Sequence, residues 1–510
     1  MNTDFLSSIK SFFQQKKIQE IISLSVILSA AFFSVFVILH NAEWILGDNY
    51  SFILTTAQGK PAPLLNNINI GHGRFFPLAG LDFNLLLLIP GGTSAFAHYL
   101  YVSFTFLVAY LFYFLFNKEI FAKSEQSFIK NNALLITSFS CLLLVTSGGF
   151  FIVFMNVIFS ERLIFLLFAL MMYSFLKGRN NGKNFWFSLA AISAIYAAYL
   201  KETIPPALFA FSFFSLIFFR KEMQKAEKYA HYAIIANFMV FMAMWLYFSQ
   251  YGKSETYQPL IMLPFAKMIK TVLWHQAILI LILAMAFYRF CAIMFFKAKP
   301  VYQHDPLLFA SAVLICEYIV LKFAADYYYF PAEALGIPSL LYFIFSLKDL
   351  CFKENPKRRI IFVATISVLL IFSVYNGISE SSVNIRHIAI ERAKVMPAMR
   401  IMAKKFLKGG KIYWITLNNG YIALFDLTKL YVNFVLKQEM GQSRSLDDSI
   451  IEPVNTIPEL STNDVVLYEV LHRMDFDVSP EALAALHRQG FDLCQYQAGY
   501  LMFTKGKCGL

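Results

Sequence analysis

Long apolar segments recur along this chain and limit what it can fold into. A helix needs about 20 mostly apolar residues to cross the hydrocarbon core of a bilayer, and about eleven segments come near that length. The chain is also 58% hydrophobic and 15% charged, against about 25% charged in soluble domains. The sequence therefore predicts an α-helical polytopic membrane protein. The expected spans are 21–40, 95–116, 132–149, 160–177, 184–200, 204–219, 232–249, 271–290, 307–325, 333–347 and 360–376.

Lysine and arginine are concentrated in alternate connections between these segments. The connections at roughly 41–83, 150–160, 201–203, 250–270 and 326–332 carry few of them. Because basic loops stay in the cytoplasm, we expect a cytoplasmic N-terminus in a bacterial-type inner membrane. The formal net charge of +12 then reflects topology, and we expect no nucleic-acid partner. The basic connections hold Lys10, Lys16, Lys17, Lys118, Lys123, Lys130, Lys177, Arg179, Lys183, Arg220, Lys221, Lys225, Lys228, Arg289, Lys297, Lys299, Lys348, Lys353, Lys357, Arg358 and Arg359.

The last part of the chain has a different pattern. A helical stretch, SVNIRHIAIERAKVMPAMRIMAKKFLK, is followed by the strand-like runs KIYWITL, DVVLYEV, FDLCQYQ and GYLMFTK around a short helix, SPEALAALHRQG. Such runs, separated by turn residues, indicate a small α/β domain. We expect a transmembrane domain at 1–376 with a long first outer loop at 41–83, and an extracytoplasmic domain at 377–510. Cys494 and Cys508 would pair there only if they lie close enough.

Common cofactor motifs are missing from the sequence. It has no G-x-x-x-x-G-K-[ST], no G-x-G-x-x-G after a strand, no H-E-x-x-H and no C-x-x-C. These motifs cradle phosphates, dinucleotides or metals. We therefore expect no nucleotide cofactor.

Charged residues near the non-basic ends of the spans are the candidates for function. Charge at membrane depth is costly unless it is paired or faces a wet cavity, so it marks functional positions by default. Each residue could instead anchor its span at the interface, and Asp48 could cap a short helix that ends at Gly59. The candidates are Glu43, Asp48, His72, Arg74, Glu161, Arg162, Lys201 and Asp326.

The order of these motifs resembles the GT-C class of integral-membrane glycosyltransferases, which includes protein O-mannosyltransferases and aminoarabinose transferases. GDNYSFILTTAQGK is similar to the first-loop motif of the class, SERLIFLLFAL to the start of its fourth span, and YLKETIPPAL to its Lys-bearing turn. The resemblance covers about the first 220 residues. Many members have two adjacent acids in the first loop, whereas Asn49 follows Asp48 here. This difference puts a metal site in doubt and leaves Asp48 or Glu43 as the base.

The resemblance implies transfer of a sugar, with inversion, from a polyprenyl-phosphate donor in the membrane. The acceptor would be an extracytoplasmic glycan, lipid or protein. Asp48 or Glu43 would take the proton of the acceptor hydroxyl, and cations would neutralise the departing phosphate. No cofactor is implied, and a requirement for a divalent metal stays open. The expected substrate-binding residues are Arg74, Glu161, Arg162, Lys201, His72 and Asp326.

Two other classes stay open. A polysaccharide polymerase or ligase would share the lipid-linked donor, but we would expect paired Arg-rich outer loops. A transporter or flippase would need charges buried within spans, and Glu317 and Lys322 in LICEYIVLKFAADY are the best such pair. Their spacing of five is poor for a bridge along a helix. The sequence also shows no sustained repeat or matched pair of broken spans, so we favour the transferase.

Overall fold

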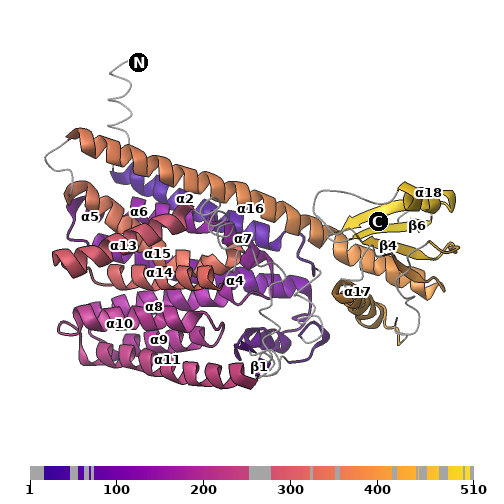
Figure 1. Ribbon diagram of the computed structural model, residues 1–510, viewed down its shortest axis with the longest axis horizontal. Helices are drawn as coiled ribbons and strands as arrows, with labels where there is room; N and C mark the ends of the chain where they lie inside the picture. Colours follow the sequence, from indigo (N-terminus) through magenta and orange to yellow (C-terminus); the bar gives the residue numbers. More distant parts are fainter. Residues whose placement is uncertain are drawn as a thin grey trace, which may run out of the picture.

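A helical bundle and a small sheet make up the structure, a computed structural model (Figure 1). The predicted helical character is confirmed. The model describes residues 16–45, 56–61, 68–69, 74–251, 277–321, 325–350, 356–415, 422–443, 446, 457–469, 480–497 and 500–505. The bundle contains α2 (Lys16–Leu39), α4 (Ala95–Ala122), α5 (Ser127–Asn131), α6 (Ala133–Val145), α7 (Gly148–Met155), α8 (Glu161–Asn181), α9 (Asn184–Ala198), α10 (Ile204–Phe219), α11 (Lys225–Tyr251), α13 (Ala277–Phe296), α14 (His304–Val320), α15 (Asp326–Leu350) and α16 (Pro356–Leu407).

Several helices have the length and composition of membrane spans. Among the described residues, α2, α4, α11, α13 and α15 pass both tests, and α6 with α7 makes a sixth if this pair, bent by 64°, is one span. Helices α9 and α10 are apolar but shorter. A helix overlaps each of the eleven predicted ranges. Among the described residues, however, only the five helices named first, or six with the bent pair, meet the criteria for a span. The count of eleven therefore stays a prediction.

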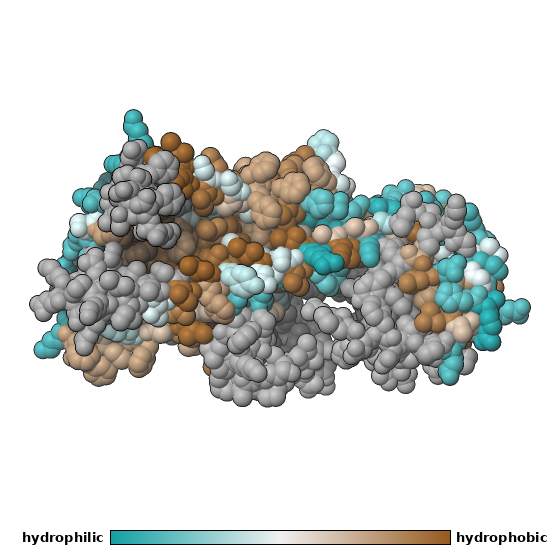
Figure 2. All heavy atoms as spheres, turned by 90° about the horizontal axis from the view of Figure 1, so that it is seen from above, coloured by the Kyte–Doolittle hydropathy of each residue, from teal (hydrophilic) through white to brown (hydrophobic). Residues whose placement is uncertain are grey.

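The helices leave hydrophobic side chains on the outside of the bundle. Phe32 and Leu28 on α2 are 76% and 67% exposed, and Tyr375 on α16 is 69% exposed. On the face that Figure 2 shows, hydrophobic residues gather over the bundle and hydrophilic residues predominate around the sheet. Exposed apolar surface of this extent is unusual for a soluble monomer. It is the surface expected where lipid is the solvent.

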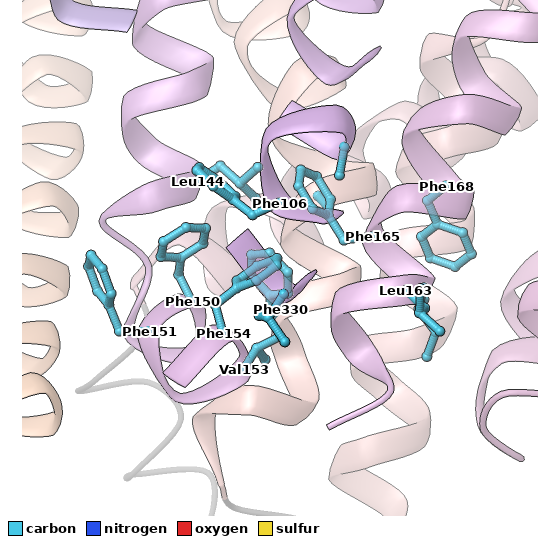
Figure 3. Close-up of a cluster of buried hydrophobic side chains, with 14 of the residues drawn as sticks. Phe106, Leu144, Phe150, Phe151, Val153, Phe154, Leu163, Phe165, Phe168 and Phe330 are labelled. Atoms are coloured by element: carbon cyan, nitrogen blue, oxygen red, sulfur yellow. The ribbon is translucent and has the colours of Figure 1, made fainter. Parts of the chain in front are cut away.

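Aromatic side chains fill the centre of the bundle. Phe106 of α4, Phe150 and Phe154 of α7, Phe165 of α8 and Phe330 of α15 are all fully buried, and they converge in Figure 3. Phe106 lies 5.3 Å from Phe150, and Phe165 lies 5.4 Å from Phe330, between ring centroids. Most of these pairs meet edge to face, the arrangement that aromatic rings prefer. This packing joins α4, α7, α8 and α15 into one unit, because helices in lipid associate largely through van der Waals contact.

The bundle has two distinct ends. We call the end beside the small sheet the sheet end and the other the opposite end (Figure 1). At the opposite end, Lys177 Nζ lies 2.9 Å from Glu119 Oε2, and Arg179 Nη2 lies 3.2 Å from Glu222 Oε2. Three of the predicted basic connections therefore meet at one end. Which end faces the cytoplasm stays a prediction.

Helix α16 links the bundle to the sheet. Its 52 residues span about 78 Å at 1.5 Å per residue, and it continues past the sheet end (Figure 1). The predicted boundary between residues 376 and 377 falls inside this helix. The division into two domains therefore stays a prediction.

Beyond α16 lies a four-stranded sheet in the order β3-β4-β6-β5. Strands β3 and β4 are parallel, and the other neighbours are antiparallel. A small core of Tyr413, Val466, Leu486, Phe491 and Phe503 packs between the sheet and α18. The elements are β3 (Ile412–Ile415), α17 (Ile422–Phe434), the π-helix η5 (Val435–Glu439), β4 (Val465–Glu469), α18 (Pro480–Arg488), β5 (Phe491–Gln497) and β6 (Tyr500–Lys505).

Short elements between α2 and α4 form the first long connection at the sheet end. A two-stranded ladder pairs Asn69 with Arg74, and the apolar 3-10 helix η3 leads into α4. The elements of this connection are η1 (Thr56–Gln58), β1 (Ile68–Asn69), β2 (Arg74–Phe75) and η3 (Leu81–Leu88).

Candidate functional site at the sheet end

Some of the predicted site residues lie outside the part of the chain that the structure describes. These are Asp48 and His72. Arg74 is described through its backbone in β2. The described candidates are Glu43, Glu161, Arg162, Lys201 and Asp326, and all lie at the sheet end.

Glu161 and Lys201 form an ion pair. Glu161 is the first residue of α8, and Lys201 lies in the connection between α9 and α10. The Lys201 ammonium donates a hydrogen bond to Glu161 Oε1, and the two side chains are 12% and 1% exposed. The ammonium also lies 4.1 Å from the ring centroid of Tyr328 and 5.3 Å from that of Tyr327. Cations are attracted to aromatic faces at such distances. Two segments far away in the sequence, at Glu161 and at Tyr327 and Tyr328, thus meet at the Lys201 ammonium.

Arg162 lies next to Glu161 but is enclosed. Its guanidinium donates to Asp82 Oδ2 in η3, and Nη1 donates to the carbonyls of Val157 and Phe159 at 3.0 and 2.8 Å. It also lies 4.3 Å from the centroid of the Phe83 ring. The side chain is 1% exposed. Arg162 therefore ties η3 to the start of α8 and so fixes the position of Glu161.

Asp82 was missed in the sequence, although it carries a signal. It stands in LDFNLLLLIP, where it is the one acid in an apolar run. An acid in such a run has to find a partner or neutralise. Its partner here is Arg162, 80 residues away, and no local pattern indicates that pairing.

Asp326 begins α15 beside two further acids. Its Oδ2 lies 3.4 Å from the point that a Cβ on Gly148 would occupy, and Glu380 Oε2 lies 2.6 Å from the same point. Glu333, two turns further along α15, interacts electrostatically with both carboxylates. Asp326 therefore belongs to an acidic group. Sequence reasoning missed Glu333 and Glu380, although an acid within an apolar span is a usable signal.

Glu43 is held by the C-terminal part of α16. Arg400 Nη2 lies 3.2 Å from Glu43 Oε1, while Arg400 Nε lies 2.7 Å from Glu439 Oε2. The hydrogen bond to Glu439, reinforced by Glu43, raises the pKa of the Arg400 guanidinium above its usual value. Arg400 thus stays charged and connects two carboxylates.

Two more residues from the C-terminal part hold the sheet end together. Arg392 is fully buried and donates to the carbonyls of Ile38, at 2.8 Å, and of Met155, at 2.6 Å. The Tyr431 hydroxyl donates to the Ile45 carbonyl. Arg392 thereby satisfies carbonyls that the ends of α2 and α7 leave without helical partners. The sequence gives no signal for either residue, because both stand in ordinary helical patterns.

A mostly apolar cavity of about 1030 Å³ lies between α10, α11, α13 and α14. Its polar lining includes Glu202 and Thr203, which directly follow Lys201, and Glu317. Glu317 is one of the two residues that the transporter alternative needs, while Lys322 lies outside the described residues. The apolar lining includes Phe214, Trp245, Leu283, Phe287, Phe290 and Phe309.

Within the described part of the chain, no three His, Cys, Asp or Glu side chains are arranged to hold a metal ion. Among these residue types, the carboxylates of Asp and Glu are the ligands that Mg²⁺ and Ca²⁺ prefer.

Comparison with known proteins finds no matching family model and no match among curated proteins. The chain is similar to solved structures at low identity. ArnT from Cupriavidus metallidurans bound to undecaprenyl phosphate matches at 10% identity and a TM-score of 0.44, over 94% of this chain and 97% of that chain. Its apo state matches at 11% and 0.46, with the same coverage. The archaeal oligosaccharyltransferase AglB from Archaeoglobus fulgidus, in complex with an inhibitory peptide and a dolichol-phosphate, matches at 12% and 0.40, over 85% of this chain and 61% of that chain.

Proposed function

We propose that this chain is a membrane glycosyltransferase that moves a sugar from a polyprenyl-phosphate donor to an acceptor outside the bilayer. The observation that carries the proposal is the position of Lys201. Its ammonium lies among Glu161, Tyr327 and Tyr328, and the next residue, Glu202, lines the large apolar cavity. A lipid with a long apolar tail and an anionic head needs these two features side by side.

The donor fits this region by size and charge. A cavity of about 1030 Å³ is just above the usual range for ligand sites, roughly 300–1,000 Å³, and its aromatic and aliphatic walls suit isoprene units. Lys201 is a point charge with three N–H donors. A phosphate oxygen would accept one of them in a charge-assisted hydrogen bond. Arg74 is the second cation that we propose for the phosphate.

Glu161 and Arg162 have positioning roles in this account. Glu161 holds the Lys201 ammonium in place before the donor binds. Arg162 donates hydrogen bonds to Asp82 and to two carbonyls. We therefore propose that it fixes the start of α8 rather than binds the phosphate.

Asp48 is the proposed general base, with Glu43 as the next candidate. The acceptor oxygen would attack the anomeric carbon while the bond from that carbon to the phosphate oxygen breaks, and its proton would pass to the carboxylate. The polyprenyl phosphate leaves as an anion, and attack opposite the leaving group inverts the anomeric centre. The proposal keeps His72 and Asp326 as residues that contact the sugar or the acceptor, which is a glycan, lipid or protein.

A bacterial inner membrane with the sheet end outside is the proposed setting. With that orientation we propose eleven spans, a transmembrane domain at 1–376 and an extracytoplasmic domain at 377–510. The positive-inside pattern supports it. Cys494 is disulfide-bonded, which also supports an oxidising compartment, while Cys508 lies outside the described residues. Alkaline phosphatase fused after residue 400 should be active and after residue 125 inactive; the reverse pattern would contradict the orientation.

Binding of undecaprenyl phosphate to the purified protein tests the function. We expect undecaprenyl phosphate to raise the melting temperature more than undecaprenol, which lacks the phosphate. Lys201→Ala should remove that difference, whereas Lys183→Ala, an exposed lysine at the opposite end, should keep it. Equal effects of the two lipids on the wild-type protein would contradict a site for a lipid phosphate.

A further inference from the structure

The break between α6 and α7 turns three backbone carbonyl oxygens towards α16. The two helices are bent by 64°, and α16 packs against the break. Ser381 Oγ donates to the Ser147 carbonyl at 3.2 Å, and Asn384 Nδ2 donates to the Gly148 carbonyl at 3.3 Å. Gly377 has no side chain to separate α16 from the Thr146 carbonyl. The carbonyls that the break frees from helical bonding are therefore directed at neighbouring elements.

A small cavity lies at this break, and its wall is partly apolar, with Leu143, Ala277 and Ile278. Its volume is about 20 Å³, and a cavity needs about 10–15 Å³ on this measure to hold one water molecule. The polar residues in its wall are Thr146, Ser147, Ser373 and Glu333. The cavity thus has room for one water or one small ion, with hydroxyl and carboxyl groups on part of its wall.

Glu333 lines the cavity with an unsatisfied oxygen. The residue is 1% exposed, and its Oε2 has no hydrogen-bond partner among the described residues. The Ser147 hydroxyl lies close to its carboxyl. The charged groups that act on Glu333 are Asp326 and Glu380, both of which are acids. A carboxyl group at such a position has to keep its proton or have a positive charge beside it.

We propose that this cavity binds one small monovalent cation, with Glu333 as its charged ligand. The other ligands would be the Ser147 hydroxyl and carbonyl oxygens at the break. Carbonyls at interrupted membrane helices, with few carboxylates, are a ligand set for Na⁺. A divalent ion would need more carboxylates, and no group of three acids, histidines or cysteines in the described chain has that arrangement.

The cation would fix the bend between α6 and α7. It would neutralise the charge of Glu333 and so connect α15 to the break between α6 and α7. This inference concerns the stability of the bundle and does not depend on the glycosyltransferase proposal.

Titration of the full-length protein in detergent tests the site. NaCl replaces N-methyl-D-glucamine chloride at constant ionic strength, with KCl in a parallel series, and the melting temperature is measured. A ligand that binds only the folded state raises stability by mass action, so we expect a saturable rise of about 2 °C or more with Na⁺ or K⁺. The absence of a saturable rise with both ions would overturn the proposal.

Variants locate the response. Glu333→Gln keeps the size of the side chain and removes its charge, so the cation response should disappear. Glu317→Gln, in the separate large cavity, should respond as the wild-type protein does. Ser147→Ala removes only a hydroxyl group and should disturb the fold less. It should raise the cation concentration at the titration midpoint several-fold. An unchanged response in Glu333→Gln would contradict the site, and so would an unchanged midpoint in Ser147→Ala. A melting temperature that depends on pH but on neither ion would show that a proton, and not a cation, neutralises Glu333, and would overturn the proposal.

Discussion

The two ends of the bundle use buried ion pairs differently. At the opposite end, Arg289 makes a two-pronged contact with Asp305, with Nε to Oδ1 and Nη2 to Oδ2 both at 2.8 Å. Asp305 also accepts from the backbone N–H of Val301 at 2.7 Å. The donors of the arginine fork match the acceptors of the carboxylate, and this pair fastens the connection between α13 and α14.

At the sheet end, Lys201 meets Glu161 as a point charge. Its other neighbours are the faces of Tyr327 and Tyr328, which attract a cation but do not take a conventional hydrogen bond. The ammonium has three N–H donors, and within the described part of the chain one of them donates a hydrogen bond, to Glu161. The arginine pair therefore uses its donors to hold a loop, whereas the lysine pair leaves the geometry that we propose for an anionic ligand.

The largest expected effect is on turnover in Asp48→Asn. Asn keeps the size of the side chain and caps a helix as well as Asp does, but it cannot accept the proton. Loss of a general base lowers the rate by about 10²- to 10⁴-fold. The measurement is sugar transfer in reconstituted vesicles, with the amount of folded protein checked by size-exclusion chromatography. A wild-type rate would make Asp48 a helix cap and Glu43 the next base to test.

Arg289→Ala should destabilise the fold and leave donor binding intact. Removing one partner leaves Asp305 buried without its counter-charge, which costs about 3–5 kcal/mol. Denaturant or thermal unfolding in detergent measures the loss, and the donor KM of the remaining folded enzyme should be unchanged. A changed donor KM with normal stability would remove the distinction between the two ends.

Lys201→Ala should show the converse behaviour. A charge-assisted contact with phosphate contributes about 1.5–3 kcal/mol, equivalent to a roughly ten- to hundred-fold weaker use of the donor. The donor KM should rise while acceptor dependence is retained. Lys201→Arg serves as the matched control because it restores the charge. Normal donor saturation in Lys201→Ala would count against this residue.

Arg400→Ala should have the smallest effect on stability. Arg400 and its partners Glu43 and Glu439 are each about one-third exposed, and partly exposed ion pairs contribute about 0–1 kcal/mol. A melting temperature within a few degrees of wild type is expected. A much larger loss would show that the clamp on Glu43 supports the fold of the whole sheet end.

The sequence predicts helices well and contacts poorly in this chain. The apolar runs locate the helices because lipid forces the backbone to pair within each segment. Helix α16 runs past its predicted span since the amphipathic pattern after residue 376 continues the same helix. Glu161 and Lys201 could be singled out by their charge near span ends, whereas their ion pair depends on how the connection between α9 and α10 lies against the start of α8. Arg392 could not be found, because a buried arginine looks the same in sequence as an exposed one.

A structure of the protein with undecaprenyl phosphate bound would show directly whether Lys201 contacts the lipid phosphate. We expect the phosphate within hydrogen-bonding distance of Lys201 Nζ, at the sheet end, and the lipid tail in the cavity between α10, α11, α13 and α14. We expect the Lys201 ammonium to keep its hydrogen bond to Glu161 and to donate a second one to a phosphate oxygen. A phosphate bound at the opposite end, or a tail outside this cavity with Lys201 still paired only to Glu161, would contradict the account.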